Sequence, residues 1–312
     1  MIREYQDRFY NRKWGVFNHF LNGIQNNPAY KNSKGITTSF DELVHGFNVE
    51  LLAKNLHQMG AGYYVITIMQ GTPHLIAPNA TFDEIAGTKP GEACSTRDLV
   101  LDISNELKKY DIDLFLYFTG DGPYKDNDIG SKFGFIEPRQ VGVTKPFVDK
   151  WTKVLEEYAV RYGDRISGWW IDGCYRDFLK YTDELLEPYY LTCKKGNPNA
   201  LVALNAGVGV SKFGTNFRLE DFTCGEMNVF EHVPERRFYD NAQAHILAPL
   251  GADDTGIGAT WGSFGLAATK EHIVDYVDRV HAAGGVVTFD IGVYRDGSYD
   301  PAQVDALSAI RR

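Results

Sequence analysis

The sequence predicts an α/β fold, and within that class a single (β/α)8 TIM barrel, from three observations. Short runs rich in β-branched and aromatic residues alternate with longer runs of helical periodicity along the whole chain. Eight strand candidates occur, which is the number that closes such a barrel. No Gly-x-Gly-x-x-Gly follows any of them, which disfavours an open dinucleotide-binding sheet.

The eight predicted strands share high β-propensity and lie between turn-forming residues. They cover residues 14–20, 63–69, 114–118, 168–172, 201–205, 221–226, 245–248 and 285–291. The segments at 221–226 and 245–248 show the weakest strand pattern of the eight. Because each strand candidate is followed by helical or loop sequence, we expect all of them to run parallel.

The predicted helices fill the gaps between these strands. They cover residues 41–60, 96–110, 147–162, 270–283 and 301–312. In the first helix, Leu43, Phe47 and Leu56 recur at helical spacing and Gly60 ends the run. The segment 120–144 follows the third strand and lacks such periodicity. Long loops of this kind are usually functional or disordered, so we expect it on the catalytic face of the barrel.

The composition predicts one globular domain over residues 1–312, without a linker or a repeat. The chain is 44% hydrophobic and 23% charged, which excludes disordered and collagen-like proteins. The net charge of −9 argues against a nucleic-acid partner. No apolar run approaches the roughly 20 residues of a membrane span, so we expect no membrane partner.

The cysteines indicate which metal sites and disulfides to expect, and the first residues indicate the compartment. Four scattered cysteines, without a Cys-x-x-Cys, predict neither a disulfide scaffold nor a structural zinc site. We therefore expect no metal and no organic cofactor. The polar segment 1–8 is not a secretory signal, which indicates a cytoplasmic protein unless a leader was removed.

Polar residues at the carboxyl ends of the predicted strands are the candidates for catalysis, because barrel active sites lie at that face. They are His19, Asp172, Asn205, Glu226 and Asp290. Asp172 is a charged residue at the end of an apolar strand. Such a charge is poorly solvated, so we expect it to have a partner or a functional role. A pair such as Asp172 and Glu226 is the minimum for retaining glycoside hydrolysis, in which one carboxylate attacks and the other exchanges a proton. We expect Asp290 to be a structural hydrogen-bond acceptor.

In this order the segments resemble the α-L-fucosidase family of glycoside hydrolases, family 29. The similar segments are residues 14–20, 59–67, 97–100, 162–173, 221–226, 260–263 and 284–301. The resemblance implies a catalytic barrel that cleaves a terminal α-L-fucoside, or a related sugar, with retention. It implies Asp172 as the nucleophile, Glu226 as the acid/base and His19 as a contact to the sugar.

The sequence also departs from this family. Gln70 stands where the family has paired His, and His74 follows a little later. Asn205 stands where an Arg is common, and a Trp-Glu is missing before Trp261. We expect no carboxyl-terminal β-sandwich of the kind that the family has. We therefore expect Gln70 and His74 to supply hydroxyl contacts, and the sugar to be fucose or a relative with different hydroxyl contacts.

Three aromatic residues are further candidates for substrate binding, namely Tyr117, Trp170 and Trp261. Aromatic rings offer flat apolar faces to sugar C–H groups, and the alternative for each ring is packing inside the barrel. For Asp172 the alternative is a carboxylate that caps the next helix or pairs with Arg176, and for Glu226 it is a structural ion pair.

Other functions compete with this interpretation. Glu231 and Glu235 are rival acids for the same role as Glu226. A non-catalytic carbohydrate-binding barrel, or a glycosidase for a different sugar, would also fit the departures from the family. A metal-dependent hydrolase is disfavoured because no His-x-His or comparable ligand cluster occurs.

Overall fold

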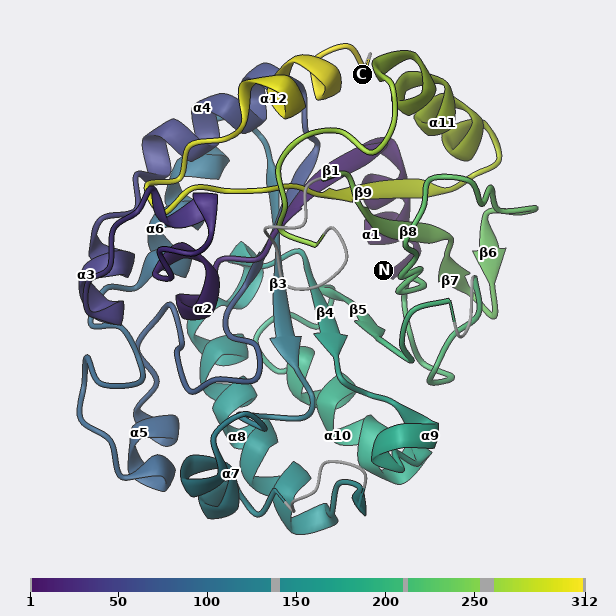
Figure 1. Ribbon diagram of the computed structural model, residues 1–312. Coiled ribbons are helices and arrows are strands. Elements are labelled where there is room, and N and C mark those ends of the chain that lie inside the picture. Colours follow the sequence, from purple (N-terminus) through teal and green to yellow (C-terminus); the bar gives the residue numbers. More distant parts are fainter. Residues whose placement is uncertain (1, 136–140, 210–212, 253–260, 311–312) are drawn as a thin grey trace.

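One curled sheet of seven parallel strands organises the computed structural model, which describes residues 2–135, 141–209, 213–252 and 261–310 (Figure 1). The sheet has the order β5-β4-β3-β2-β1-β9-β8. Its strands are β1 (Trp14–Asn18), β2 (Tyr63–Thr67), β3 (Asp113–Thr119), β4 (Gly168–Asp172), β5 (Leu201–Leu204), β8 (His245–Pro249) and β9 (Val286–Asp290). A short antiparallel pair, β6 (Phe238–Tyr239) and β7 (Ala242–Gln243), precedes β8. The α/β prediction is confirmed, and the sheet curls as in a TIM-like half-barrel.

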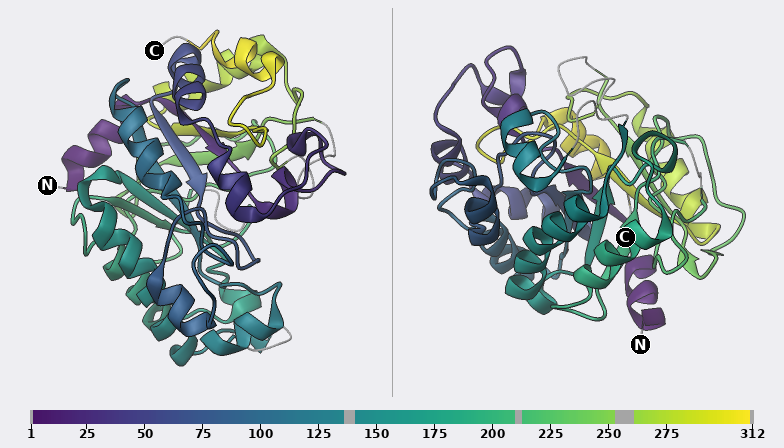
Figure 2. Two further views of the ribbon diagram at one scale, coloured as in Figure 1. Left: turned by 90° about the vertical axis from the view of Figure 1, so that its left-hand side faces the viewer. Right: turned by 90° about the horizontal axis from the view of Figure 1, so that it is seen from below.

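The helices surround this sheet, most of them on its outer face, whereas the first one packs against its inner face (Figures 1 and 2). They are α1 (Ile2–Asn11), α2 (Asn22–Gln25), α3 (Phe40–His45), α4 (Val49–Met59), α5 (Ala80–Ala86), α6 (Leu99–Lys108), α7 (Asn127–Phe133), α8 (Lys145–Tyr162), α9 (Arg176–Leu179), α10 (Asp183–Cys193), α11 (Lys270–Ala282) and α12 (Pro301–Leu307), with 3₁₀ turns η1 (Lys31–Ser33) and η3 (Gly163–Arg165). None of these described helices is long and apolar enough to cross a membrane.

The prediction of one continuous helix over residues 41–60 is wrong. This segment forms α3 and α4, because the side chain of Asn48 accepts a hydrogen bond from the backbone N–H of Leu51 and starts a new helix. The helix predicted over 301–312 ends earlier, at Leu307. In the loop predicted over 120–144, α7 forms, and residues 136–140 lie outside the described part of the chain. Residue 260 of the late Trp-Gly motif lies outside it as well.

The core has two layers, one on each face of the sheet. The outer layer packs the sheet against the helices. The inner layer fills the curl with large aromatic side chains, among them Phe17, Phe115 and Trp170. Phe9 of α1 packs against Phe115 with their ring centroids 5.2 Å apart. The strands β1, β2 and β3 are buried along their whole length, as is typical of parallel strands between two apolar layers.

The strand predicted at 221–226 does not form as a regular strand. Residues 222 and 226 make only isolated parallel bridges, to Gln243 and Leu247. Between them Gly225 adopts a φ of +58°, and a Cβ at this position would lie 1.8 Å from the carbonyl oxygen of His245. This left-handed residue, pressed against β8, interrupts the ladder.

The irregular segment nevertheless lies against both edge strands of the sheet. The backbone N–H of Met227 donates to the carbonyl of Leu247 in β8 at 2.8 Å. The backbone N–H of Asp221 donates to the carbonyl of Val202 in β5 at 2.9 Å. The segment therefore carries Glu226 to the same end of the sheet as the carboxyl ends of β4 and β5.

We predict that Gly225→Ala lowers the free energy of unfolding by about 2–3 kcal/mol, because alanine meets both the positive φ and the carbonyl of His245. Urea denaturation measures the change. Gly23→Ala is the matched control, since nothing lies within 4 Å of a Cβ added there. Equal stability of the two variants would contradict this explanation of the irregular segment.

Candidate active site

Two carboxylates and one amide meet at the carboxyl end of the sheet. Asp172 is the last residue of β4, Asn205 follows β5, and Glu226 lies on the irregular segment beside β8. The Nδ2 of Asn205 donates to Oδ1 of Asp172 at 2.8 Å and to Oε2 of Glu226 at 2.5 Å. One amide nitrogen thus holds both carboxylates, and three of the sequence candidates lie together.

Tyrosine hydroxyl groups complete the surroundings of Asp172. Tyr117 donates to its Oδ2 at 2.5 Å and Tyr175 to its Oδ1 at 3.1 Å. Gln70 in turn donates to the hydroxyl of Tyr117 at 2.9 Å. Burial, together with the charge of Asp172, keeps the pKa of Tyr117 well above its ordinary value, so the hydroxyl remains a donor. With Asn205, three donors fix the orientation of the Asp172 carboxylate.

Sequence reasoning missed Tyr175. Its hydroxyl reaches Asp172 because the chain turns tightly after β4, where Gly173 has a φ of +69°. The negative charge of Asp172 is the main reason that the pKa of Tyr175 is raised, followed by burial. The only signal in the sequence was its position three residues after the end of the strand.

Glu226 is partly buried beside the charge of Asp172. Burial is the larger cause and the Asp172 carboxylate the second, and together they raise the pKa of Glu226 to about 8. The hydrogen bond from Asn205 acts in the opposite direction. Glu226 therefore keeps its proton at neutral pH. A carboxyl group that holds its proton at this pH can act as an acid.

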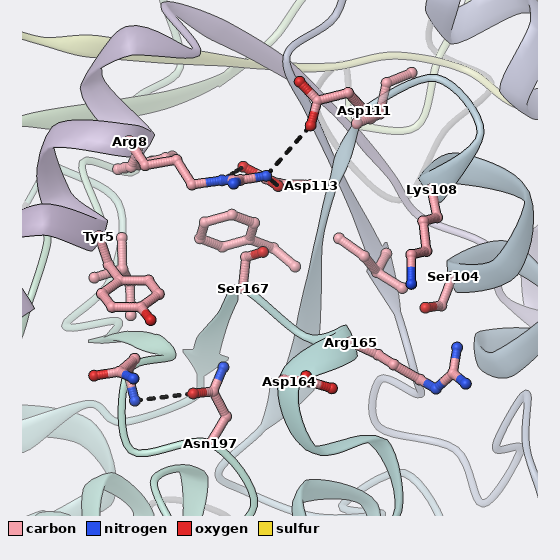
Figure 3. Close-up of a pocket in the computed structure, with 16 residues that line it drawn as sticks. Tyr5, Arg8, Ser104, Lys108, Asp111, Asp113, Asp164, Arg165, Ser167 and Asn197 are labelled. Carbon is pink, nitrogen blue, oxygen red and sulfur yellow. Dashed lines mark hydrogen bonds and ion pairs between the residues drawn. The ribbon is translucent and has the colours of Figure 1, made fainter.

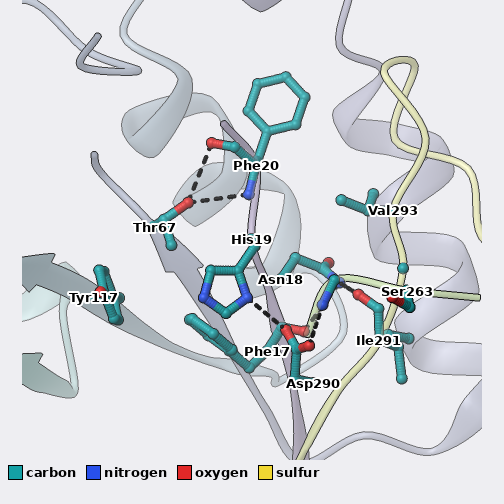
Figure 4. Close-up of polar contacts among 12 residues, drawn as sticks. Phe17, Asn18, His19, Phe20, Thr67, Tyr117, Ser263, Asp290, Ile291 and Val293 are labelled. Atoms are coloured by element: carbon teal, nitrogen blue, oxygen red, sulfur yellow. Dashed lines mark hydrogen bonds and ion pairs between the residues drawn. The ribbon is translucent and has the colours of Figure 1, made fainter. Parts of the chain in front are cut away.

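A second polar group lies at the end of β1 (Figure 4). Nδ1 of His19 is 2.9 Å from Oδ1 of Asp290, and the other oxygen of Asp290 accepts from the backbone N–H of Gly262 at 2.5 Å. The ring of His19 meets those of Trp261 and Tyr117 edge to face, at 5.9 and 6.1 Å. Asp290 therefore holds an imidazole that lies beside two other candidates.

Two other residues predicted to bind substrate, Trp170 and His74, lie outside the hydrogen-bond network of the two carboxylates. The ring of Trp170 stacks on Tyr117 at 5.5 Å and its Nε1 donates to the carbonyl of Cys224 at 3.3 Å, so it packs beneath the carboxylates. His74 contacts Phe40 and Asn22 instead. No hydrogen bond between described residues links His74 to Asp172 or Glu226.

The alternative pair of Asp172 with Arg176 does not form. Arg176 bonds to Asn216 and Asp183 and not to Asp172. The rival acids Glu231 and Glu235 are exposed and lie outside the hydrogen-bond network of Asn205. Within residues 2–135, 141–209, 213–252 and 261–310, no group of three His, Cys, Asp or Glu side chains could hold a metal ion.

A separate pocket of about 640 Å³ lies at the opposite end of the sheet (Figure 3). Asp113, at the start of β3, lines it together with Arg8, whose Nη2 donates to this carboxylate at 2.5 Å. Asp172 pairs with Thr119 at the far end of the same strand. The length of β3 therefore separates this pocket from the two carboxylates.

The fold is similar to that of fucose-acting glycoside hydrolases. The endo-fucoidan hydrolase MfFcnA9 of family 107 matches with a TM-score of 0.70 and 16% identity, over 97% of this chain and 62% of its own. MfFcnA4 of the same family matches with 0.66 and 15%, over 95% and 51%. An α-L-fucosidase of family 29 from Bacteroides thetaiotaomicron matches with 0.63 and 16%, over 98% and 72%.

At these low sequence identities, the comparisons show a similarity of fold. This chain spans between about half and three fifths of the length of the two family-107 chains. No protein-family model and no curated protein sequence matches it. The class that fold and site define together is a TIM-like half-barrel with a partly buried carboxylate pair at the carboxyl end of its parallel sheet.

We predict that Glu226 destabilises the folded chain increasingly as pH rises. Its pKa is raised from 4.5 to about 8 on folding, so the folded state holds a proton that the unfolded state has lost between these values. The free energy of unfolding of the native chain, relative to that of Glu226→Gln, should therefore fall between about pH 4.5 and pH 8. Urea denaturation at several pH values measures this difference, and a difference that does not vary with pH would refute the assignment.

Proposed function

We propose that residues 1–312 form a single catalytic domain, a retaining glycoside hydrolase that cleaves an α-L-fucoside or a related sugar. One observation carries the proposal, namely that the amide of Asn205 bonds to both Asp172 and Glu226. Two oxygens at 2.8 and 2.5 Å from one nitrogen are at most about 5.3 Å apart. Retaining enzymes hold their carboxyl groups about 5–5.5 Å apart, whereas inverting enzymes need about 6.5–9.5 Å.

The reaction would run in two displacements. Asp172 attacks the anomeric carbon and forms an ester, while the bond to the leaving oxygen breaks and Glu226 gives that oxygen its proton. Glu226 then removes a proton from water, the water oxygen attacks the same carbon, and Asp172 leaves as a carboxylate. Because the ester has no charge, the pKa of Glu226 drops in the intermediate, which makes it a better base for the second step.

The sugar would lie over the polar groups beside Asp172. His19, oriented by Asp290, and Gln70 can bond to hydroxyl groups, and Trp261 offers an aromatic face. His74 contacts Asn22 and Phe40, so it would bind a sugar only if the sugar extended beyond the groups around Asp172. Fucose is favoured because the structural neighbours include endo-fucoidan hydrolases and α-L-fucosidases, one of the latter solved as a covalent intermediate with 2-fluoro-fucosyl fluoride. The steps need no metal and no organic cofactor.

We predict that Asp172→Asn lowers the rate of 4-nitrophenol release from the aryl α-L-fucoside by about a thousandfold or more, because the amide cannot form the ester. Asp164→Asn, an exposed position at the opposite end of the sheet, is the matched control. Turnover of another aryl glycoside instead of the fucoside would support the proposed mechanism and would contradict the proposed specificity for fucose. Full activity of Asp172→Asn would refute the nucleophile, and binding without turnover would favour a carbohydrate-binding protein.

We predict that kcat/KM falls as pH rises through about 8, since the first step needs the proton of Glu226. In Glu226→Gln this alkaline limb should disappear, and the loss of kcat/KM should be larger for an alkyl glycoside than for the 4-nitrophenyl glycoside. Nitrophenolate leaves without protonation, whereas an alkoxide does not. An unchanged pH profile in the variant would rule out Glu226 as the acid.

A further inference from the structure

The pocket of about 640 Å³ at the amino end of the sheet lies far from the two carboxylates (Figure 3). Its walls come from α1, from α6 with the start of β3, from η3 before β4, and from the segment before β5. The seven residues of β3 separate it from Asp172 by roughly 20 Å. Sites for small organic ligands have volumes of about 300–1,000 Å³, so the pocket is large enough to be one.

The backbone at the base of the pocket is fixed by its own contacts. The N–H of Ser167 donates to the carbonyl of Leu114 at 2.8 Å, and the N–H of Leu201 donates to the carbonyl of Ser167 at 2.8 Å. At the next residue, Gly168, a Cβ would lie 2.2 Å from a ring carbon of Phe115, so this ring packs directly on the start of β4. The starts of three strands therefore form a firm base without any bound molecule.

Four polar side chains in the lining have hydrogen-bonding capacity to spare (Figure 3). Tyr5 lies on α1, Ser104 and Lys108 lie one turn apart on α6, and Ser167 precedes β4. In the part of the chain that the structure describes, neither the three hydroxyl groups nor the ammonium group has a hydrogen-bond partner. Donors and acceptors on three walls can therefore bond to a ligand that carries polar atoms around its edge.

The charges in the lining favour an uncharged ligand. Three cations and three carboxylates line the pocket, namely Arg8, Lys108, Arg165, Asp111, Asp113 and Asp164. Arg8 already pairs with Asp113, to which its Nε donates at 2.9 Å and its Nη2 at 2.5 Å. An anion would lie near three carboxylates and a cation near three basic groups, and such juxtaposition of like charges is unfavourable.

We propose that this pocket is a second, non-catalytic binding site for an uncharged saccharide. A sugar ring carries hydroxyl groups around its rim, each of them donor and acceptor, and these match the polar groups on three walls. Its C–H faces are apolar, and the half-buried ring of Tyr5, which packs on the inner aromatic layer, offers a matching surface. The inference goes beyond the proposed function and does not depend on Asp172 or Glu226.

The separation of the two sites decides how the proposal is tested. A small saccharide in the pocket would not touch the carboxylates, which lie at the other end of β3. The measurement must therefore report on the pocket itself. Asn199→Cys places a thiol in the lining and leaves the four polar groups intact, and the native cysteines are all buried.

The experiment measures how fast iodoacetamide alkylates this thiol, by mass spectrometry, with increasing concentrations of fucose, galactose, mannose, glucose and their disaccharides. We expect the best saccharide to slow alkylation about tenfold at ten times its dissociation constant, because only the free protein reacts. Ser131→Cys, on an exposed site of α7 outside the lining, is the control and should not be protected.

Two further variants identify the groups that bind. Lys108→Met and Tyr5→Phe each remove one polar group and keep the rest of the side chain. Each should raise the dissociation constant about three- to tenfold, the effect of one lost hydrogen bond. Lys109→Met changes the neighbouring lysine outside the lining and should keep the original constant. Calorimetric titration of these variants with Asn199 retained gives the same comparison without the thiol.

Three results would overturn the saccharide site. No sugar of the series slows alkylation of Asn199→Cys, or Lys108→Met and Tyr5→Phe both keep the original constant. Protection by inorganic phosphate but by no sugar would mean that the pocket binds an anion. Hydrolysis at Asp172 and Glu226 is measured separately by 4-nitrophenol release, so either proposal can fail while the other stands.

Discussion

The arrangement of this site depends on the amide nitrogen of Asn205, which donates to two carboxylates at once. Two negative charges at this distance in a partly buried place repel each other strongly, so the pair is more stable when one member keeps a proton. The raised pKa of Glu226 expresses that constraint. Tyr117 and Tyr175 donate hydrogen bonds to Asp172, which stabilise negative charge on that carboxylate.

The fold places the three groups by two different means. Asp172 and Asn205 come from adjacent parallel strands, whose carboxyl ends meet at one edge of the sheet. Glu226 comes from a segment without a regular ladder. His245 of β8 lies within hydrogen-bonding distance of the carbonyls of Thr223 and Cys224 through Nδ1, at 2.9 and 3.1 Å. Burial lowers the pKa of His245 to about 4, so this ring is neutral and bonds without bringing a charge near the pair.

The sequence was most informative where the physics is local. Strands buried on both faces appear as continuous apolar runs, which made β1 to β5 predictable, and a carboxylate at the end of such a run identified Asp172. The break between α3 and α4 had a local signal too, since Asn48 is a good helix cap. The irregular segment had none, because its shape depends on the approach of Gly225 to His245, 20 residues away. Likewise His19 and Asp290 are separated by 271 residues, so only the fold could show their contact.

The most direct test of the account is the anomeric configuration of the first product. Proton NMR, during hydrolysis of 4-nitrophenyl α-L-fucoside and before mutarotation, observes which anomer of the sugar appears first. Two carboxylates held by one amide should give the α anomer first, since two inversions restore the starting configuration. Appearance of the β anomer first would mean direct attack by water and would contradict the role of Asp172 as the nucleophile.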